Sequence, residues 1–186
     1  MADTYLVGLS GPPRSGKDTL AGLVRRHFVN SKVRTQVHSL SLPMRLAVYA
    51  YLGLEYSPEH YEANKDYEFD VPGERCFTTI RNEMISLSEH FVKPRLGHGW
   101  WGRALLNRVT PGTQLILVPD MGFRAEHEVF TETLTDCLWI HLQRDGTDFS
   151  KDSRSYVGSG PTVRNNRSPE VAADRIIGHI EAKGWF

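Results

Sequence analysis

Ser10-Gly11-Pro12-Pro13-Arg14-Ser15-Gly16-Lys17-Asp18-Thr19 is the stretch of sequence that decides the fold. It fits the pattern G-x-x-x-x-G-K and directly follows a β-rich run, Thr4–Leu9. An amphipathic helix is expected directly after it, over Gly16–Phe28. In this order, a strand, a glycine-containing loop and a helix form a phosphate-binding loop, where backbone N–H groups and the positive end of the helix surround a phosphate chain. The stretch therefore predicts a site for a nucleoside triphosphate.

The side chains of this loop indicate which groups would contact the triphosphate. Glycines at its two ends permit backbone turns that are closed to other residues, and Lys17 would reach the β- and γ-phosphates. The residue after the lysine is normally Ser or Thr, whose hydroxyl binds Mg²⁺, but here it is Asp18, followed by Thr19. Either side chain could serve the ion, so ATP and Mg²⁺ are the expected cofactors. The residues expected to bind ATP here are Gly11, Arg14, Ser15, Gly16, Lys17, Asp18 and Thr19.

Further strand patterns alternate with helical ones along the chain. Strands are expected at Val33–His38, Gln114–Pro119, Cys137–Leu142 and Thr162–Asn165. This alternation predicts a three-layer α/β fold, with a central parallel sheet of about five strands and helices on both faces. We expect one domain over residues 1–186, with an acceptor-binding region at about 41–110 and a mobile lid at about 146–161.

The helices are predicted from their apolar spacing and their first-turn signals. One opens at Pro43 and runs to about Leu52, and the polar, aromatic stretch Tyr56–Arg75 is interpreted as an excursion over the surface. The next is capped by Thr78 or Thr79 and ends near Pro94. The remaining helices are expected at Trp100–Val109, at Arg124–Leu134 and from Ser168 to about Lys183.

Composition excludes several classes of protein. The 186 residues are 40% apolar and carry 22 basic and 22 acidic side chains, which excludes a disordered chain and disfavours a general polyanion binder. Cys76 and Cys137 match no metal-binding spacing and are expected to be free, buried thiols in a reducing compartment. The apolar runs are too short to form a signal peptide or to span a membrane, so we expect a soluble, cytoplasmic protein.

Asp120 directly follows the most apolar predicted strand. A carboxylate there points into the crevice in which parallel sheets bind ligands, where it could hold Mg²⁺ through water or accept a proton. A plain turn or helix-capping aspartate is the structural alternative. Phosphoryl transfer also needs cations around the moving phosphate, and the candidates are Arg45, Arg81, Arg124, Arg144 and Arg154.

Several of these motifs together resemble the bacteriophage deoxynucleoside monophosphate kinases. The loop of that family also reads R-S-G-K-D-T, and the resemblance continues at Leu42-Pro43-Met44-Arg45 and at Val118-Pro119-Asp120. Further matches in kind and order are Arg81, Trp101, Arg124, Glu128, Arg144 and Asn166-Arg167-Ser168.

The resemblance implies a P-loop kinase fold, with ATP and Mg²⁺ as cofactors and a small deoxynucleotide as the acceptor. It implies catalytic roles for Lys17, Asp120, Arg124 and Arg144. It would place Arg124 near the acceptor, and Arg144 and Arg154 on the lid side, with Arg154 against ATP. The metal would be held by Asp18, Thr19 or Asp120. The residues implicated in acceptor binding are Arg45, Arg81, Glu89, Trp101 and Glu128.

The chain departs from this family where the acceptor base would bind. The family has a glutamine and a Gly-Thr-Asp run, whereas this chain has Ile85 and Ser88-Glu89-His90. The alternative acceptor is 5-hydroxymethyluracil within DNA, because related phage enzymes phosphorylate that base. Asp120, Glu89 or His90 would then take the proton of the hydroxyl. The DNA would lie in a basic and aromatic groove formed by Arg95, His98, Trp100, Trp101, Arg103 and Arg108. A second alternative is a nucleotide-binding protein without catalysis, and the oligomeric state stays open.

Overall fold

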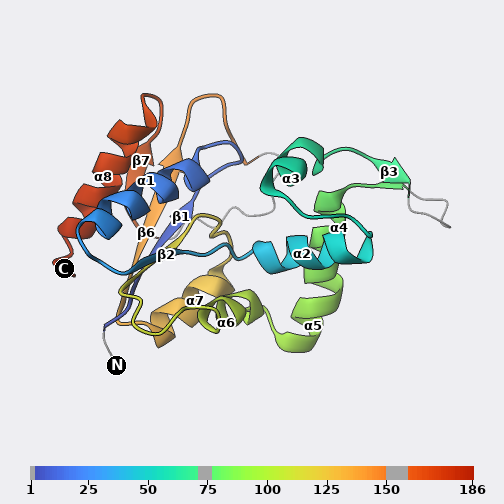
Figure 1. The fold of residues 1–186 in the computed structure, drawn as a ribbon, viewed down its shortest axis with the longest axis horizontal. Coiled ribbons are helices and arrows are strands. Elements are labelled where there is room, and N and C mark those ends of the chain that lie inside the picture. The colour runs from blue at the N-terminus through green and yellow to red at the C-terminus, as the bar shows by residue number, and fades with distance from the viewer. Residues whose placement is uncertain (1–2, 71–76, 150–158) are drawn as a thin grey trace. The chain divides into compact units, whose positions relative to one another are not determined.

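The computed structural model describes residues 3–70, 77–149 and 159–186. The chain divides into two compact units, the first comprising residues 1–40 and 101–186 and the second residues 41–100 (Figure 1). Nine residues of the predicted lid, 150–158, lie outside the described residues, and so do Arg154 and Cys76. The prediction that residues 1–186 form one domain stays a prediction.

The first unit contains a five-stranded parallel sheet in the order β2-β5-β1-β6-β7. Its strands are β1 (Tyr5–Ser10), β2 (Thr35–Val37), β5 (Leu115–Val118), β6 (Asp136–Gln143) and β7 (Thr162–Arg164). At the centre, Val7 of β1 is in register with Leu117 of β5 on one side and with Leu138 of β6 on the other. This sheet confirms the predicted α/β class and the predicted strand number.

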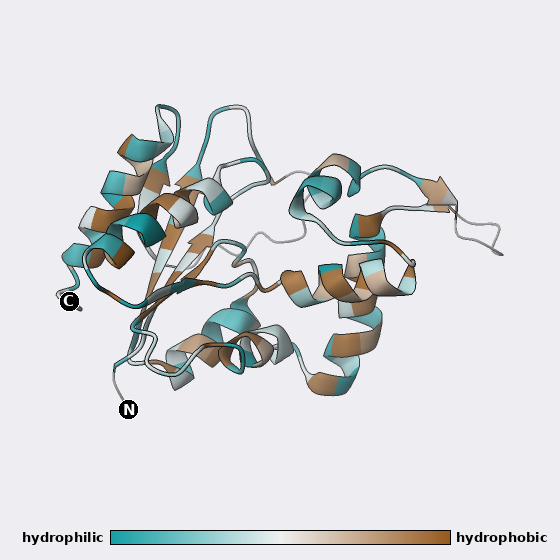
Figure 2. Cartoon of the chain, in the orientation of Figure 1, coloured by the Kyte–Doolittle hydropathy of each residue, from teal (hydrophilic) through white to brown (hydrophobic). Residues whose placement is uncertain are grey.

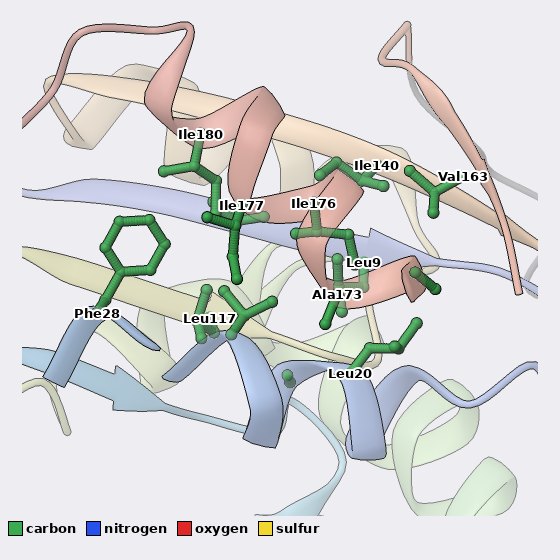
Figure 3. Packing of buried hydrophobic residues seen from close by; sticks show 14 of the residues in the cluster. Leu9, Leu20, Phe28, Leu117, Ile140, Val163, Ala173, Ile176, Ile177 and Ile180 are labelled. Carbon is green, nitrogen blue, oxygen red and sulfur yellow. The ribbon is translucent and has the colours of Figure 1, made fainter. Parts of the chain in front are cut away.

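One face of the sheet is covered by α1 (Lys17–Asn30) and α8 (Pro169–Glu181) (Figure 1). Side chains from both helices interlock with alternate residues of the strands, as Figure 3 shows. The buried cluster includes Leu20, Phe28, Ile176 and Ile180 from the helices and Leu9, Leu117 and Ile140 from the strands. Because every second strand residue enters this cluster, the residues between them face the opposite side of the sheet.

The opposite face carries α6 (Trp100–Leu106) and α7 (Arg124–Thr133) (Figure 1). Trp139 of β6 meets the His127 ring of α7 edge-on, with ring centroids 4.2 Å apart. The indole lies directly over Gly8, where an added Cβ would come within 2.2 Å of the ring. Glycine in the middle of β1 is therefore required by the tryptophan on the neighbouring strand.

The second unit is mainly helical and has its own small core. Its elements are α2 (Leu42–Tyr51), α3 (Pro58–Asn64), β3 (Phe69–Asp70), β4 (Phe77–Thr78), α4 (Ile80–Ser86), the π-helix η1 (Leu87–Val92) and α5 (Lys93–Leu96). β3 and β4 pair antiparallel. The core consists of Val48, Tyr49, Tyr61, Ile80 and Met84, and apolar positions recur along these helices (Figure 2).

Two predictions of local structure differ from the structure in this part of the chain. The stretch interpreted as a surface excursion contains α3, because Ser57 caps that helix by accepting the His60 N–H and Pro58 opens it. The helix expected to end near Pro94 continues to Leu96, since Pro94 falls in the first turn of α5, directly after the π-helical segment. There the missing N–H of the proline is tolerated.

Two smaller expectations also changed. Helix α6 ends at Leu106, before the predicted Val109. Cys137 is free but only partly buried, and burial, reinforced by Asp136, raises the pKa of its thiol to about 12. No helix within the described ranges is long and apolar enough to cross a membrane.

Candidate active site

The glycine-containing loop joins β1 to α1, as its sequence predicts. Gly16 occupies the N-cap of α1 with φ 94° and ψ 16°, a left-handed conformation that disfavours other residues. An added Cβ at Gly16 would lie 2.5 Å from Nδ2 of Asn165. Gly16 makes no side-chain cap hydrogen bond to the helix, and the positive end of the helix dipole favours an anionic ligand at this terminus.

The ammonium group of Lys17 lies inside the loop. Nζ donates to the carbonyl oxygens of Gly11 and Pro12, both at 2.8 Å, and approaches Oγ of Ser15 at 3.4 Å. The positive charge is thus held beside the first amides of α1 by uncharged carbonyl groups. A phosphate chain in the loop would offer this cation a stronger, charge-assisted acceptor than the carbonyls.

Two residues from other strands support the loop from outside. Asn165, which follows β7 and is only 5% exposed, donates from Nδ2 to the Ser15 carbonyl at 2.9 Å. Arg144, which follows β6, donates to the carbonyl of Arg14 at 3.2 Å, and Arg14 itself has a positive φ of 64°. Arg144, expected on the lid side, thus contacts the loop, and its catalytic role stays a prediction. Asn165 was missed, and the one available signal was its place at the end of the last predicted strand.

Asp120 lies two residues beyond β5, and both of its carboxylate oxygens accept hydrogen bonds. Ser39 Oγ donates to Oδ2 at 2.7 Å, and the Leu40 N–H donates to Oδ1 at 2.9 Å. Arg108 holds the same segment by donating to the Ser39 carbonyl at 3.0 Å. Asp120 thus fixes the chain that leaves β2 against the chain that leaves β5. Sequence reasoning did not find Ser39, and it gave Arg108 a different role.

The loop, Asp120, Arg144 and Asn165 all lie at one edge of the sheet. Each follows the carboxyl end of a parallel strand, and β1, β5, β6 and β7 are neighbours in the sheet. In open α/β sheets, ligands bind outside the carboxyl ends of the strands. This edge is therefore the candidate site of the first unit.

Three other predicted residues of the first unit do not contribute to this hydrogen-bonded edge. Arg124 at the start of α7 is paired with Glu128 at 2.9 Å, and its side chain is 78% exposed. Since the two residues lie one helical turn apart, this is a surface ion pair of the i, i+4 type. Trp101 is only 6% exposed and belongs to the core. The roles assigned to these residues in transfer and acceptor binding stay predictions.

The remaining predicted acceptor residues belong to the second unit. Arg45 stacks over the ring of Tyr61, with Cζ 4.2 Å from the ring centroid. Arg81 makes a forked ion pair with Asp66, from Nε to Oδ1 at 2.6 Å and from the terminal nitrogen to Oδ2 at 3.3 Å. Glu89 on the π-helix is paired with the buried Lys93.

His141 on β6 is a candidate that the sequence did not single out. It is the register partner of Ser10, the last residue before the loop, and it stacks near Phe149 with centroids 6.2 Å apart. Its Nδ1 is buried and has no hydrogen-bond partner among the residues that the structure describes. Burial lowers the pKa of this imidazole, which favours the neutral form.

The polar groups at the sheet edge fit a nucleotide-bound Mg²⁺ better than a metal held by protein alone. In the described part of the chain, no group of three or more His, Cys, Asp or Glu side chains could hold a metal ion. Mg²⁺ bound with a nucleotide usually takes only one or two protein oxygens and completes its shell with phosphate and water. Asp18, Thr19 and Asp120 offer oxygens of the required kind.

Comparison with solved structures identifies the fold. The APS kinase of Mycobacterium tuberculosis, in complex with AMPPNP and APS, matches with a TM-score of 0.57 and 15% identity, over 97% of this chain and 99% of that chain. A cysteine-to-alanine mutant of the same enzyme matches with a TM-score of 0.55 and 16% identity at the same coverage. The chain has the fold of the P-loop kinases. No family model and no curated protein matches it, so its likeness to the phage enzymes is carried by the motifs alone.

Proposed function

We propose that the chain is an ATP-dependent kinase that transfers the γ-phosphate of ATP to a deoxynucleoside monophosphate. The observation that carries the proposal is the position of Lys17. Its ammonium group lies within a glycine-containing loop, at the uncapped N-terminus of α1 and at the carboxyl edge of a parallel sheet. This combination favours a phosphate chain and gives it one charge partner in a fixed place.

The residues of the first unit would bind and orient ATP. The amides of the loop and of the first turn of α1 donate to the phosphates, and Lys17 transfers its hydrogen bonds from the carbonyls of Gly11 and Pro12 to phosphate oxygens. Arg144, which already lies at the Arg14 carbonyl, supplies a second cation beside the loop. Such positioning and charge neutralisation supply most of the catalysis in phosphoryl transfer.

Mg²⁺, when bound with ATP, neutralises charge on the phosphates. Asp18 or Thr19 would hold it from the start of α1, and Asp120 from the end of β5, directly or through water. Ser39 and Leu40 orient the Asp120 carboxylate by donating to its two oxygens. This orientation makes Asp120 a better metal ligand than a freely rotating carboxylate.

The acceptor would bind through Arg45 and Arg81, the two arginines that the resemblance assigns to it. A monophosphate is already anionic, so its attack on ATP needs no general base, and cations that clamp it supply the binding energy. Both arginines belong to the second unit and contact the segment that contains α3. Arg45 lies over Tyr61, and the backbone N–H of Arg81 donates to the carbonyl of Lys65, one helical turn beyond Tyr61, at 3.0 Å. These contacts support a phosphate monoester as the acceptor.

The DNA alternative gains less support from the geometry. Two members of its predicted groove, Trp101 and Arg108, are used within the first unit, Trp101 in the core and Arg108 at the Ser39 carbonyl. Neither is arranged to stack on a base or to contact a DNA phosphate. Duplex DNA containing 5-hydroxymethyluracil therefore serves as the comparison acceptor in the experiment below.

The test is phosphate transfer by the purified full chain. ATP labelled in its γ-phosphate would be supplied with Mg²⁺ and, separately, with each deoxynucleoside monophosphate and with duplex DNA containing 5-hydroxymethyluracil. We expect label on a monophosphate and its loss in Lys17→Met, with Lys32→Met, another lysine of the first unit, as the control. Label on DNA alone would contradict the proposed acceptor. ATP binding without transfer to any acceptor would identify a non-catalytic nucleotide-binding protein.

A further inference from the structure

Two cationic side chains of the second unit lie against the same aromatic ring, that of Tyr61. Cζ of Arg45 is 4.2 Å from the ring centroid, and Nζ of Lys65 is 5.4 Å from it. Both distances fall within the range of cation–π attraction. The ring itself cannot move far, since Tyr61 is 5% exposed and belongs to the core of the unit. Tyr61 therefore fixes where these two charges lie.

A third cationic residue, Arg81, is connected to Lys65 by a backbone hydrogen bond. The Arg81 N–H donates to the Lys65 carbonyl, and the Arg81 guanidinium forms its forked ion pair with Asp66, the next residue. Lys65 is also paired with Glu62. The carboxylate of each pair is well exposed, with Glu62 62% and Asp66 59% exposed, although Lys65 and Arg81 are only 19% and 32% exposed; solvent at the carboxylate limits the free energy that each pair contributes. A dianionic phosphate can therefore replace these carboxylates at modest cost.

We propose that Tyr61 is a positioning residue that holds Arg45 and Lys65 beside Arg81, so that the three cations form one site for the phosphate group of the acceptor. This inference rests on the proposed function and extends it to Tyr61 and Lys65. Like charges repel, and two cations without an intervening group would move apart. The attraction of each cation to the electron-rich ring offsets this repulsion while leaving the N–H groups of the cations able to donate to a ligand.

The spacing of these residues on α3 explains how the arrangement forms. Tyr61 and Lys65 are four residues apart, and Lys65 is the C-cap of the helix, so both side chains lie on one side of α3. Arg45 comes from α2, whose residues Val48 and Tyr49 pack with Tyr61 in the core. The packing that stabilises the unit thus also sets the positions of the cations.

The experiment varies the electron density of the ring while keeping its shape. In the full chain, Tyr61 would be replaced by phenylalanine and by a trifluorinated phenylalanine, and the KM values for the monophosphate and for ATP would be measured. Tyr61→Phe keeps the π face and should change neither KM by more than about twofold. The fluorinated ring loses cation–π attraction, so the KM for the monophosphate should rise roughly three- to tenfold, with the KM for ATP unchanged.

A second readout measures the phosphate site without turnover. Calorimetry would compare the binding of thymidine monophosphate with that of thymidine, because only the phosphate distinguishes them. Fluorination at Tyr61 and the variant Lys65→Met should each weaken the binding of thymidine monophosphate and leave the binding of thymidine unchanged. The control is the same fluorinated residue at Tyr56, whose ring packs edge-on against Tyr49.

The outcomes separate the two levels of the proposal. If the wild-type chain phosphorylates a monophosphate but the fluorinated Tyr61 variant keeps both KM values, the positioning role is wrong and the kinase function stands. Equal effects of fluorination at Tyr61 and at Tyr56 would likewise overturn it, since these would reflect packing alone. A wild-type chain that neither binds nor phosphorylates a monophosphate contradicts the proposed acceptor, and the Tyr61 site with it.

Discussion

The side-chain amide of Asn165 donates a hydrogen bond to the carbonyl oxygen of Ser15 at 2.9 Å, across 150 positions of sequence. Both residues are buried, and the contact joins the end of β7 to the middle of the phosphate-binding loop. The same amide nitrogen lies only 2.5 Å from the position that a Cβ on Gly16 would take. The last strand of the sheet therefore determines the shape of a loop that begins after the first.

Asn165→Ala should loosen the loop without removing any group that contacts the phosphates. The variant leaves the buried Ser15 carbonyl without its partner, which costs about 1–3 kcal/mol of unfolding free energy. We expect a KM for ATP raised about fivefold or more, as measured by steady-state kinetics. Asn166→Ala is the control, because among the described residues the Asn166 side chain accepts a hydrogen bond from the N–H of the exposed Asp145 and makes no hydrogen bond to the loop. An Asn165→Ala enzyme with wild-type KM would show that the loop keeps its shape unaided.

Gly16→Ala should abolish ATP binding. Its Cβ would meet Asn165 at 2.5 Å, and its backbone would stay in a left-handed conformation, so the loop must rearrange. Gly22→Ala, six residues further along α1, is the matched control, since a Cβ there meets nothing within 4 Å. Alanine at that position should stabilise the helix by about 0.5–1 kcal/mol. Calorimetric titration with ATP and thermal unfolding would measure the two effects, and tight binding by Gly16→Ala would contradict this account of the loop.

Asp120→Asn should lower kcat about tenfold or more, with a smaller change in the KM for ATP. The amide keeps the size of the side chain but removes the charge that would face Mg²⁺. Ser39→Ala serves as the comparison, because it removes one hydrogen bond to Oδ2 and leaves the charge. We expect Ser39→Ala to retain more activity than Asp120→Asn. Equal losses in the two variants would indicate that Asp120 acts only by fixing the chain after β2.

The stability of the protein should fall as the pH drops below the ordinary histidine pKa of 6.5. Burial lowers the pKa of His38, His127 and His141, with Arg108 adding to the effect at His38. Between pH 6.5 and the lower pKa of the folded protein, the unfolded chain binds more protons than the folded chain. The stability contributed by the neutral histidines is therefore complete above pH 6.5 and is lost as the pH falls through this range. Urea unfolding at about pH 7.5 and about pH 5.5 measures the loss.

His141→Phe tests which group causes this loss. It removes one buried titrating ring and keeps an aromatic partner for Phe149, so its stability should depend less on pH than that of the wild type. A steeper dependence, or stability that rises in acid, would contradict the burial-based account.

The fold was predictable where the physical signal is local. β1, β5 and β6 are apolar runs with clear ends, and the G-x-x-x-x-G-K motif lies in the loop before Lys17. Each of these signals is contained within about ten residues. Helix α3 was missed because its apolar content is low and one tyrosine, Tyr61, anchors it to the core. The continuation of the helix past Pro94 was missed because a π-helical segment has no recognised sequence pattern of its own.

Of the residues at the candidate site, sequence reasoning singled out only those of the loop, Asp120 and Arg144, and their roles stay predictions. Ser39 and Arg108 contact the Asp120 region from positions far away in the sequence, and Asn165 reaches the loop from the last strand. Such partners depend on the order of strands in the sheet, which local patterns do not specify. The cation–π contacts of Tyr61 are also tertiary, since Arg45 comes from a different helix.

The central claim is that the backbone amides around Gly16 and the ammonium group of Lys17 hold the phosphates of ATP. Its most direct test is to follow the amide resonances of residues 11–19 by NMR while AMPPNP and Mg²⁺ are added to the full chain. We predict large, saturable shifts of the Gly16, Lys17 and Asp18 amides, and their loss in Lys17→Met. Saturable shifts confined to other parts of the chain, or no shifts at all, would contradict it.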